Sequence, residues 1–167
     1  MGLLDNLSGM PDWDDEFMSM YQDSEKEDWQ PDATHEACKA LYLQWRQVVL
    51  LLNGLLDSVT TTEDSFPMEI LESQKEIVLV DAHEVAAKIR SSEAGGIYIL
   101  RMENAAIIRK NAQFIKTSIA GMLAEEVIEE QHGELVRAEI DKFRELFKQW
   151  IATFKKDEFD DEWGLFV

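Results

Sequence analysis

The chain is poor in cysteine, proline and glycine, and each shortage excludes a class of fold or site. A single cysteine in 167 residues excludes a disulfide-based scaffold and a zinc site built from several cysteines. Three prolines and eight glycines are too few for a turn-rich β-sandwich or β-barrel. Hydrophobic residues nevertheless make up 46% of the chain, so we expect one domain with a buried core.

Positive charge and long apolar runs are also lacking. The formal net charge of -18 opposes binding to nucleic acid or to an anionic membrane, because both are polyanions. The most apolar window, residues 48–56, is interrupted by Asn53 and Gly54 and is much shorter than the ~20 apolar residues of a membrane helix. The first residues carry neither the basic region nor the apolar run of a signal peptide, and we therefore expect a cytoplasmic protein.

The negative charge is concentrated at the two ends of the chain. Residues 1–36 hold eleven acidic residues and one basic residue, and residues 157–167 hold five acidic residues and no basic one. The intervening residues 37–156 carry 18 acidic and 15 basic residues, a net charge of only -3. The sequence therefore predicts an acidic, partly disordered N-terminal arm over 1–31, a helical domain over 32–156, and an acidic C-terminal tail over 157–167.

Both acidic ends also carry aromatic residues, which solvating acidic tails usually lack. An acidic segment with spaced aromatic side chains can dock on a basic, apolar surface of a protein partner, or it can fold back onto its own domain. If the last helix continued into the tail, spacings of 4 and 3 would align its three aromatic residues on one face. The candidate partner-docking residues are Trp13, Phe17, Phe159, Trp163 and Phe166.

Four segments in the middle of the chain have the apolar periodicity of amphipathic helices. They span about residues 32–58, 67–91, 97–132 and 134–156. Short connections make successive helices antiparallel neighbours, so we predict an all-α protein, an up-down-up-down four-helix bundle with acidic, aromatic-containing terminal arms. Trp45, Phe147 and Trp150 lie on the apolar stripes and are predicted core residues.

The third predicted helix has a row of polar residues between two apolar rows. Asn104, Asn111 and Ser118 recur every seven residues and so lie on one side of that helix. A buried polar group without a partner costs about 1–3 kcal/mol, so we expect both asparagines to be buried and hydrogen-bonded to neighbouring helices, which would fix the helix register. Two alternatives are open: the row lines a pocket for a small molecule or water, or it faces a partner.

No arrangement of residues predicts a catalytic site, a cofactor or a metal centre. Asp32 and Glu129 each precede a histidine by three positions, a spacing that di-metal helical bundles use. The predicted topology places these histidines, His35 and His132, at opposite ends of the domain, where they cannot share a metal pair. Cys38 lies beside an apolar stripe, and we interpret it as a small core residue.

These features favour a non-enzymatic helical module that binds a protein partner with a basic or apolar surface. An adaptor, a chaperone or an immunity-like inhibitor would have this character. The alternative is a bundle enzyme, or a carrier of a metal or small molecule, whose site lies among the polar residues of the third helix. Homo-oligomerisation is a third outcome, because an apolar stripe that four helices leave uncovered would pair with a second copy.

Overall fold

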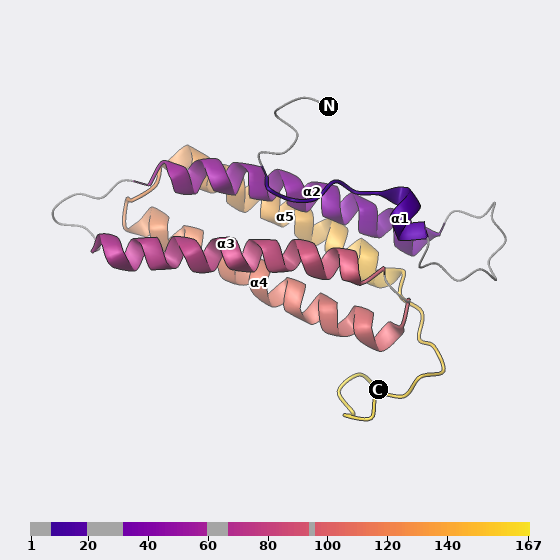
Figure 1. Cartoon of the computed structure of the whole chain (residues 1–167). Helices are drawn as coiled ribbons and strands as arrows, with labels where there is room; N and C mark the ends of the chain where they lie inside the picture. Colours follow the sequence, from indigo (N-terminus) through magenta and orange to yellow (C-terminus); the bar gives the residue numbers. More distant parts are fainter. Residues whose placement is uncertain (1–7, 20–31, 60–66, 94–95) are drawn as a thin grey trace.

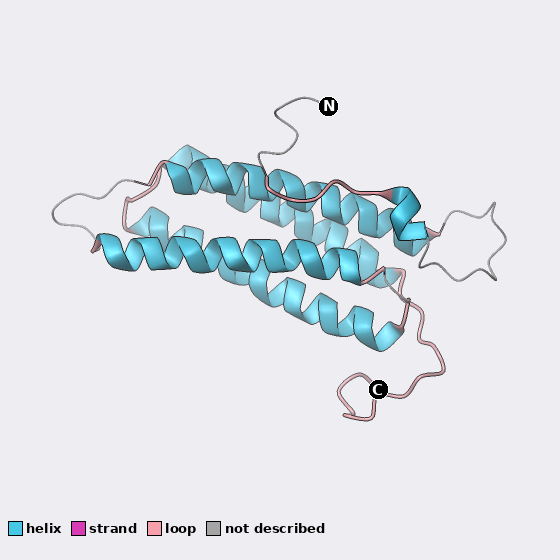
Figure 2. Cartoon of the chain, in the orientation of Figure 1, coloured by secondary structure: helices cyan, strands magenta, loops and turns pink. Residues whose placement is uncertain are grey.

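The computed structural model describes residues 8–19, 32–59, 67–93 and 96–167, and every regular element in those ranges is an α-helix (Figures 1 and 2). A short helix, α1 (Asp15–Ser19), precedes four long ones. These are α2 (Ala33–Asp57), α3 (Met68–Ser91), α4 (Tyr98–Ala124) and α5 (Glu130–Ala152). The predicted all-α class is confirmed for these residues. Among them, no helix is long and apolar enough to cross a membrane.

The four long helices form two layers, with α2 and α5 in one and α3 and α4 in the other (Figure 1). Each helix of one layer also contacts one helix of the other: α2 packs on α3, and α4 packs on α5. The described residues of the two diagonal pairs, α2 with α4 and α3 with α5, make no comparable contact. A single apolar core therefore lies between the layers and is shared by all four helices.

Helices α2 and α5 run antiparallel, as three polar contacts along their length show. Near one end the Thr34 hydroxyl donates to the Thr153 carbonyl at 3.3 Å. In the middle the Gln44 amide donates to the carboxylate of Glu139 at 2.7 Å. At the other end the His132 ring nitrogen Nε2 lies 3.0 Å from the Leu51 carbonyl. The first and last long helices are thus paired in register over their whole length.

The boundary between α4 and α5 differs from the sequence prediction. Helix α4 ends at Ala124 instead of continuing to residue 132, and Glu126 has a left-handed backbone with φ 55°. Val127 and Ile128 follow it in a loop and are buried. Because these two residues bury apolar side chains as a further helical turn would, periodicity alone did not reveal the break.

Gly133, which separates the predicted helices 97–132 and 134–156, lies inside the first turn of α5. A Cβ atom at this position would come within 2.7 Å of the Leu123 side chain and 3.1 Å of the Ile128 side chain. The glycine therefore permits close approach of α5 to the loop, a packing role. At its other end, α5 stops at Ala152, before the predicted residue 156, and the Thr153 hydroxyl donates to the Trp150 carbonyl there.

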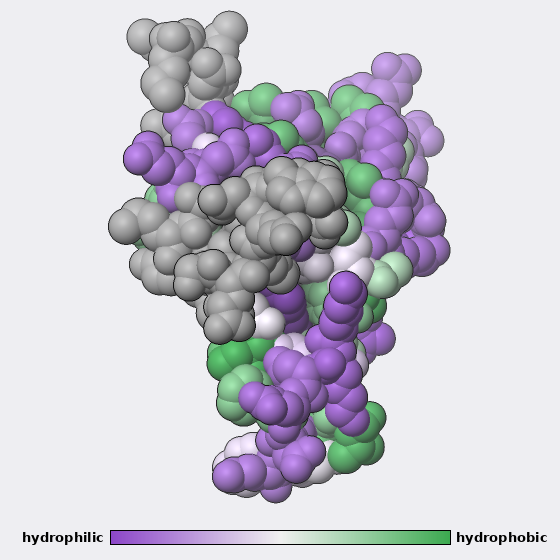
Figure 3. All heavy atoms as spheres, turned by 90° about the vertical axis from the view of Figure 1, so that its right-hand side faces the viewer, coloured by the Kyte–Doolittle hydropathy of each residue, from purple (hydrophilic) through white to green (hydrophobic). Residues whose placement is uncertain are grey.

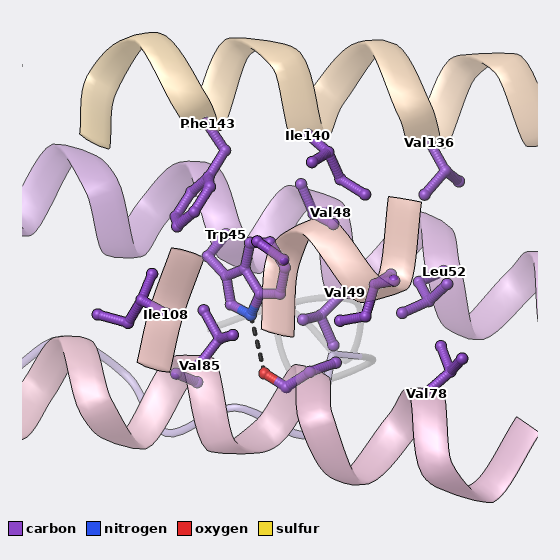
Figure 4. Close-up of a cluster of buried hydrophobic side chains, with 14 of the residues drawn as sticks. Trp45, Val48, Val49, Leu52, Val78, Val85, Ile108, Val136, Ile140 and Phe143 are labelled. Carbon is purple, nitrogen blue, oxygen red and sulfur yellow. Dashed lines mark hydrogen bonds between the residues drawn. The ribbon is translucent and has the colours of Figure 1, made fainter. Parts of the chain in front are cut away.

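The predicted apolar stripes build the core (Figure 4). Trp45 and Trp150 are fully buried and Phe147 is 8% exposed, as predicted. The Trp45 indole Nε1 donates to the Ala82 carbonyl at 2.8 Å, and its ring centroid lies 4.6 Å from that of Phe143 (Figure 4). The Trp150 indole N–H, by contrast, is buried without an acceptor in the described part of the chain. The two core tryptophans thus differ in one hydrogen bond.

This difference predicts unequal effects of the same substitution. Trp45→Phe and Trp150→Phe remove the same side-chain volume, but only the first removes a hydrogen bond, worth about 1 kcal/mol, and only the second relieves an unpaired donor. We expect Trp45→Phe to lower the free energy of unfolding by roughly 1–3 kcal/mol more than Trp150→Phe does. Urea unfolding followed by circular dichroism measures both, and equal losses would contradict the assignment.

Candidate functional site

The described N-terminal residues 8–19 lie along α2 (Figure 1). Met10 is buried, and Trp13 is partly buried with its ring centroid 5.4 Å from Tyr42 and 5.6 Å from His35. The Tyr42 hydroxyl donates to the Pro11 carbonyl at 2.6 Å. Trp13, a candidate partner-docking residue, thus packs on its own domain, which is the fold-back alternative for this arm. The remainder of the predicted arm, 1–7 and 20–31, lies outside the described residues.

Acidic residues of this segment bind basic residues of α2. Asp12 pairs with Arg46 at 3.0 Å, and Asp15 pairs with Lys39 at 2.6 Å. Hydrogen bonds from Lys39 and from the Trp13 indole lower the pKa of Asp15. The segment therefore combines an aromatic anchor with flanking ion pairs. Phe17, the other candidate in this arm, is 44% exposed on α1.

A buried ionic cluster lies beneath this segment, where α2 begins and α3 ends. Glu93 is only 3% exposed, and its Oε2 lies 3.2 Å from Nδ1 of His35. The Arg101 guanidinium lies 4.0 Å from the other carboxylate oxygen and donates to the Ser92 carbonyl at 3.2 Å. Burial and the Glu93 charge raise the pKa of the Cys38 thiol well above its usual range. Cys38 is therefore a protonated core residue, unsuited to act as a nucleophile.

The cluster can hold helix ends together, and Oε1 of Glu93 is buried without a hydrogen-bond partner in the described part of the chain. Its carboxylate joins α3 to His35 of α2 and to Arg101 of α4. Among the described residues, no group of three or more histidine, cysteine, aspartate and glutamate side chains could hold a metal ion. His132 lies in the first turn of α5 and not at the end of the third long helix, where the sequence placed it. It contacts Leu51 near the last turns of α2, so it lies far from His35 in the first turn of that helix.

The polar row of α4 has one deeply buried member at its centre. Asn111 is 1% exposed and its amide donates to Glu84 of α3 at 2.6 Å, while Ser118 is also buried. Asn104 donates to Ser91 at 3.3 Å but is partly exposed, so its predicted burial is wrong. Figure 1 shows why: α4 diverges from α3 toward its first residue. These bonds pair α3 and α4 antiparallel.

The row does not line a hollow that described residues of α4 and α5 form. This hollow, with a volume of about 60 Å³, lies between α4 and α5 and is lined by residues such as Arg109, Ile140 and Phe147. None of the three row residues is among its lining residues. The row therefore faces α3, on the opposite side of α4 from the hollow.

The acidic tail, residues 157–167, leaves the end of α5 without continuing the helix (Figure 1). The condition under which its aromatic residues would share one helical face is therefore not met, because α5 ends at Ala152. The base of the tail is fixed: the Asp157 carboxylate accepts the backbone N–H of Tyr98 at 2.8 Å, at the first turn of α4. A carboxylate there also complements the positive end of the helix dipole.

The tip of the tail folds around one carboxylate. Asp161 accepts the backbone N–H groups of Trp163 at 3.0 Å, Leu165 at 2.7 Å and Phe166 at 2.8 Å. These hydrogen bonds lower the pKa of Asp161, and Gly164 supplies the left-handed backbone, φ 67°, that the turn requires. An acidic residue is thus the structural centre of the tail as well as part of its charge.

The tail presents large apolar side chains to solvent. Trp163 is 93% exposed and Phe159 55%, while Phe166 is partly buried. Leu165 and Val167 are also exposed, although the spacing of aromatic residues in the sequence does not indicate them. In Figure 3 the tail forms the lowest part of the surface, where hydrophobic and hydrophilic residues alternate. The tail therefore combines exposed apolar groups with a net negative charge.

The buried cluster predicts a large stability loss when its carboxylate is removed. Glu93→Ala leaves Arg101 and His35 without their buried acidic partner, and breaking a buried pair in this way costs about 3–5 kcal/mol. Glu76→Ala, at an exposed position on α3, the helix that ends two residues before Glu93, is the matched control and should change stability by less than about 0.5 kcal/mol. Chemical denaturation compares them, and similar midpoints for both variants would refute the structural role of Glu93.

The turn in the tail should unfold at acidic pH. Because the pKa of Asp161 is lowered from its ordinary value of 3.8, its hydrogen bonds stabilise the turn fully above that pH and are lost as the pH falls through the lowered pKa. At neutral pH, Asp161→Ala should remove the slow exchange of the Trp163, Leu165 and Phe166 amides, whereas Asp160→Ala should not. Amide hydrogen exchange by NMR tests this, and unchanged exchange in Asp161→Ala would exclude the turn.

Comparison with known proteins supplies no relative. No family model, no curated protein and no solved structure matches the chain. Function must therefore be inferred from the tail, the N-terminal segment and the helices themselves.

Proposed function

We propose that this chain is a non-enzymatic protein-binding module, an up-down-up-down four-helix bundle whose acidic C-terminal tail docks on a basic, apolar surface of a protein partner. The observation that carries the proposal is the 93% exposure of Trp163 in a turn held by Asp161. An exposed tryptophan in a fixed turn is a suitable anchor, because tryptophan is enriched among residues that dominate binding energy. Since the turn already orders the backbone, less conformational entropy is lost on docking.

The charge of the tail selects the kind of partner. Five acidic residues and no basic one surround Trp163, so a basic surface would attract the tail and a nucleic acid or anionic membrane would repel it. The apolar side chains of Phe159 and Leu165 flank Trp163 and are also exposed. A protein surface with basic residues around an apolar depression fits both properties.

The N-terminal segment supports this proposal, because it already uses the same chemistry within the chain. There Trp13 packs on Tyr42 while Asp12 and Asp15 pair with Arg46 and Lys39 of α2. An aromatic anchor flanked by carboxylates is therefore compatible with docking on a helix that carries basic residues. The C-terminal tail offers an equivalent set of groups to a partner.

The polar row of α4 offers less support for an enzyme or a carrier. Asn111 already donates to Glu84, and the row is separate from the hollow between α4 and α5. The thiol of Cys38 is buried and protonated. The tail is therefore the stronger candidate for the functional site.

Affinity capture from extracts of the source cells tests the role of the tail. We expect the full chain to capture a basic protein, and Trp163→Ala to weaken that capture by more than tenfold, since truncating a dominant anchor costs about 2 kcal/mol or more. Added salt should also weaken capture, because charges are screened over about 8 Å at physiological ionic strength. Leu135→Ala, a comparably large apolar residue that is 46% exposed on α5, is the matched control and should capture normally.

The same capture experiment also shows whether the tail has no binding role. Trp163 is almost fully exposed, so its replacement should leave the melting temperature unchanged. If Phe159→Ala combined with Trp163→Ala retains every captured protein at wild-type levels, the tail serves only to solubilise the chain.

A further inference from the structure

A second apolar surface lies on the outer side of α3 and α4 and is independent of the tail. Val80 is 66% exposed, Ile77 49%, Leu100 46% and Phe114 41%, and Ile107 between the last two is partly exposed. We refer to these five residues as the α3–α4 face. On α2 and α5, by contrast, the large apolar residues with comparable exposure are the single residues Leu43 and Leu135.

Helix geometry places the five residues together. The hydrogen bond between Glu84 and Asn111 crosses from α3 to α4 and marks the side on which the helices meet. Val80 and Ile77 precede Glu84 by four and seven residues, so all three residues lie on the same side of α3. Ile107 precedes Asn111 by four residues and Phe114 follows it by three, and the same rule places them on its side of α4. Leu100 precedes Ile107 by seven residues, or about two helical turns, and so extends the row of Ile107 and Phe114 along α4.

We propose that the α3–α4 face is the interface of a homodimer, in which the α4 helices of two copies pack antiparallel about a two-fold axis near Ile107. The row is symmetric about that residue, because Leu100 lies seven positions before it and Phe114 seven positions after it. Antiparallel packing therefore places Leu100 of each copy beside Phe114 of the other. Such a self-complementary patch is what a two-fold interface requires.

The charges beside the row select a second copy of this chain and its direction. Glu103 and Lys110 are exposed and lie four residues before and three residues after Ile107. In the antiparallel arrangement, Glu103 of each copy faces Lys110 of the other, so two attractive pairs form. Parallel packing would oppose glutamate to glutamate and lysine to lysine, which is destabilising. Lys110 also interacts with Asp81 of α3, a neighbouring acid on the same surface.

The face is large enough for a specific but modest dimer. About 18 residues of α4 centred on Ile107 span roughly 30 Å, and two adjacent helices are about 20 Å wide. The footprint is then roughly 600 Å² per copy, or about 1,200 Å² in total, the lower end of specific interfaces. We therefore expect a dimer that dissociates on dilution.

Sedimentation velocity of the full chain over a dilution series tests the proposal. We expect a reversible monomer–dimer equilibrium that Phe114→Lys shifts to monomer by at least tenfold in the dissociation constant. Leu135→Lys is the matched control, since Leu135 is exposed to a similar degree on α5, and it should dimerise normally. Trp163→Ala should also dimerise normally, because the tail lies outside the interface.

Charge reversal tests the direction of packing. Glu103→Lys alone and Lys110→Glu alone should each weaken dimerisation, because each homodimer then opposes like charges. An equimolar mixture of the two variants should restore a heterodimer, in which both pairs are again attractive. Circular dichroism confirms that each variant is folded, and Leu100→Lys replaces Phe114→Lys if the latter is not. A wild-type chain that stays monomeric at high concentration overturns the proposal, as does a mixture that fails to associate.

Discussion

The buried carboxylate of Glu93 is the interaction on which one end of this molecule depends. It lies where α2 begins, α3 ends and α4 begins, and it contacts His35 and Arg101 from the two neighbouring helices. A carboxylate that is 3% exposed requires polar or charged partners, so the His35 and Arg101 side chains fix the relative positions of three helix ends. His35 in turn lies 3.4 Å from Asp15, which attaches the N-terminal segment to the same junction.

This junction also supports the base of the C-terminal tail. Arg101 lies over the Phe154 ring at 5.9 Å, just beyond the end of α5, and Asp157 binds the first turn of α4 three residues later. The tail therefore begins at a fixed point while Trp163 is left in solvent. This combination would suit the proposed docking role, because the helices determine the position of the tail while its exposed tryptophan would be accessible to a partner.

The sequence was sufficient to predict features that depend on periodic burial along a helix. It was insufficient where a loop buries apolar residues as a helix would, or where one segment could pack on two different surfaces. The stripe containing Trp45 and the one containing Trp150 were correct, because burial of one helical face leaves a clear period. The end of α4 was not, since Val127 and Ile128 are buried from a loop. Trp13 could have docked on its own domain or on a partner with the same groups, and only the folded structure shows that it lies beside Tyr42.

If both proposals hold, the tail and the α3–α4 face would act together in a way that neither would alone. In the proposed antiparallel dimer, each tail begins beside Tyr98. Each Tyr98 lies nine residues before Ile107, so the two Tyr98 residues lie on opposite sides of the two-fold axis, each nine residues from it. At 1.5 Å per residue, the two tail bases are then about 27 Å apart along α4. A partner that carries two basic, apolar depressions at about that separation would bind both tails at once. The second contact would then be intramolecular, so dimerisation would increase the strength of partner binding without any new contact.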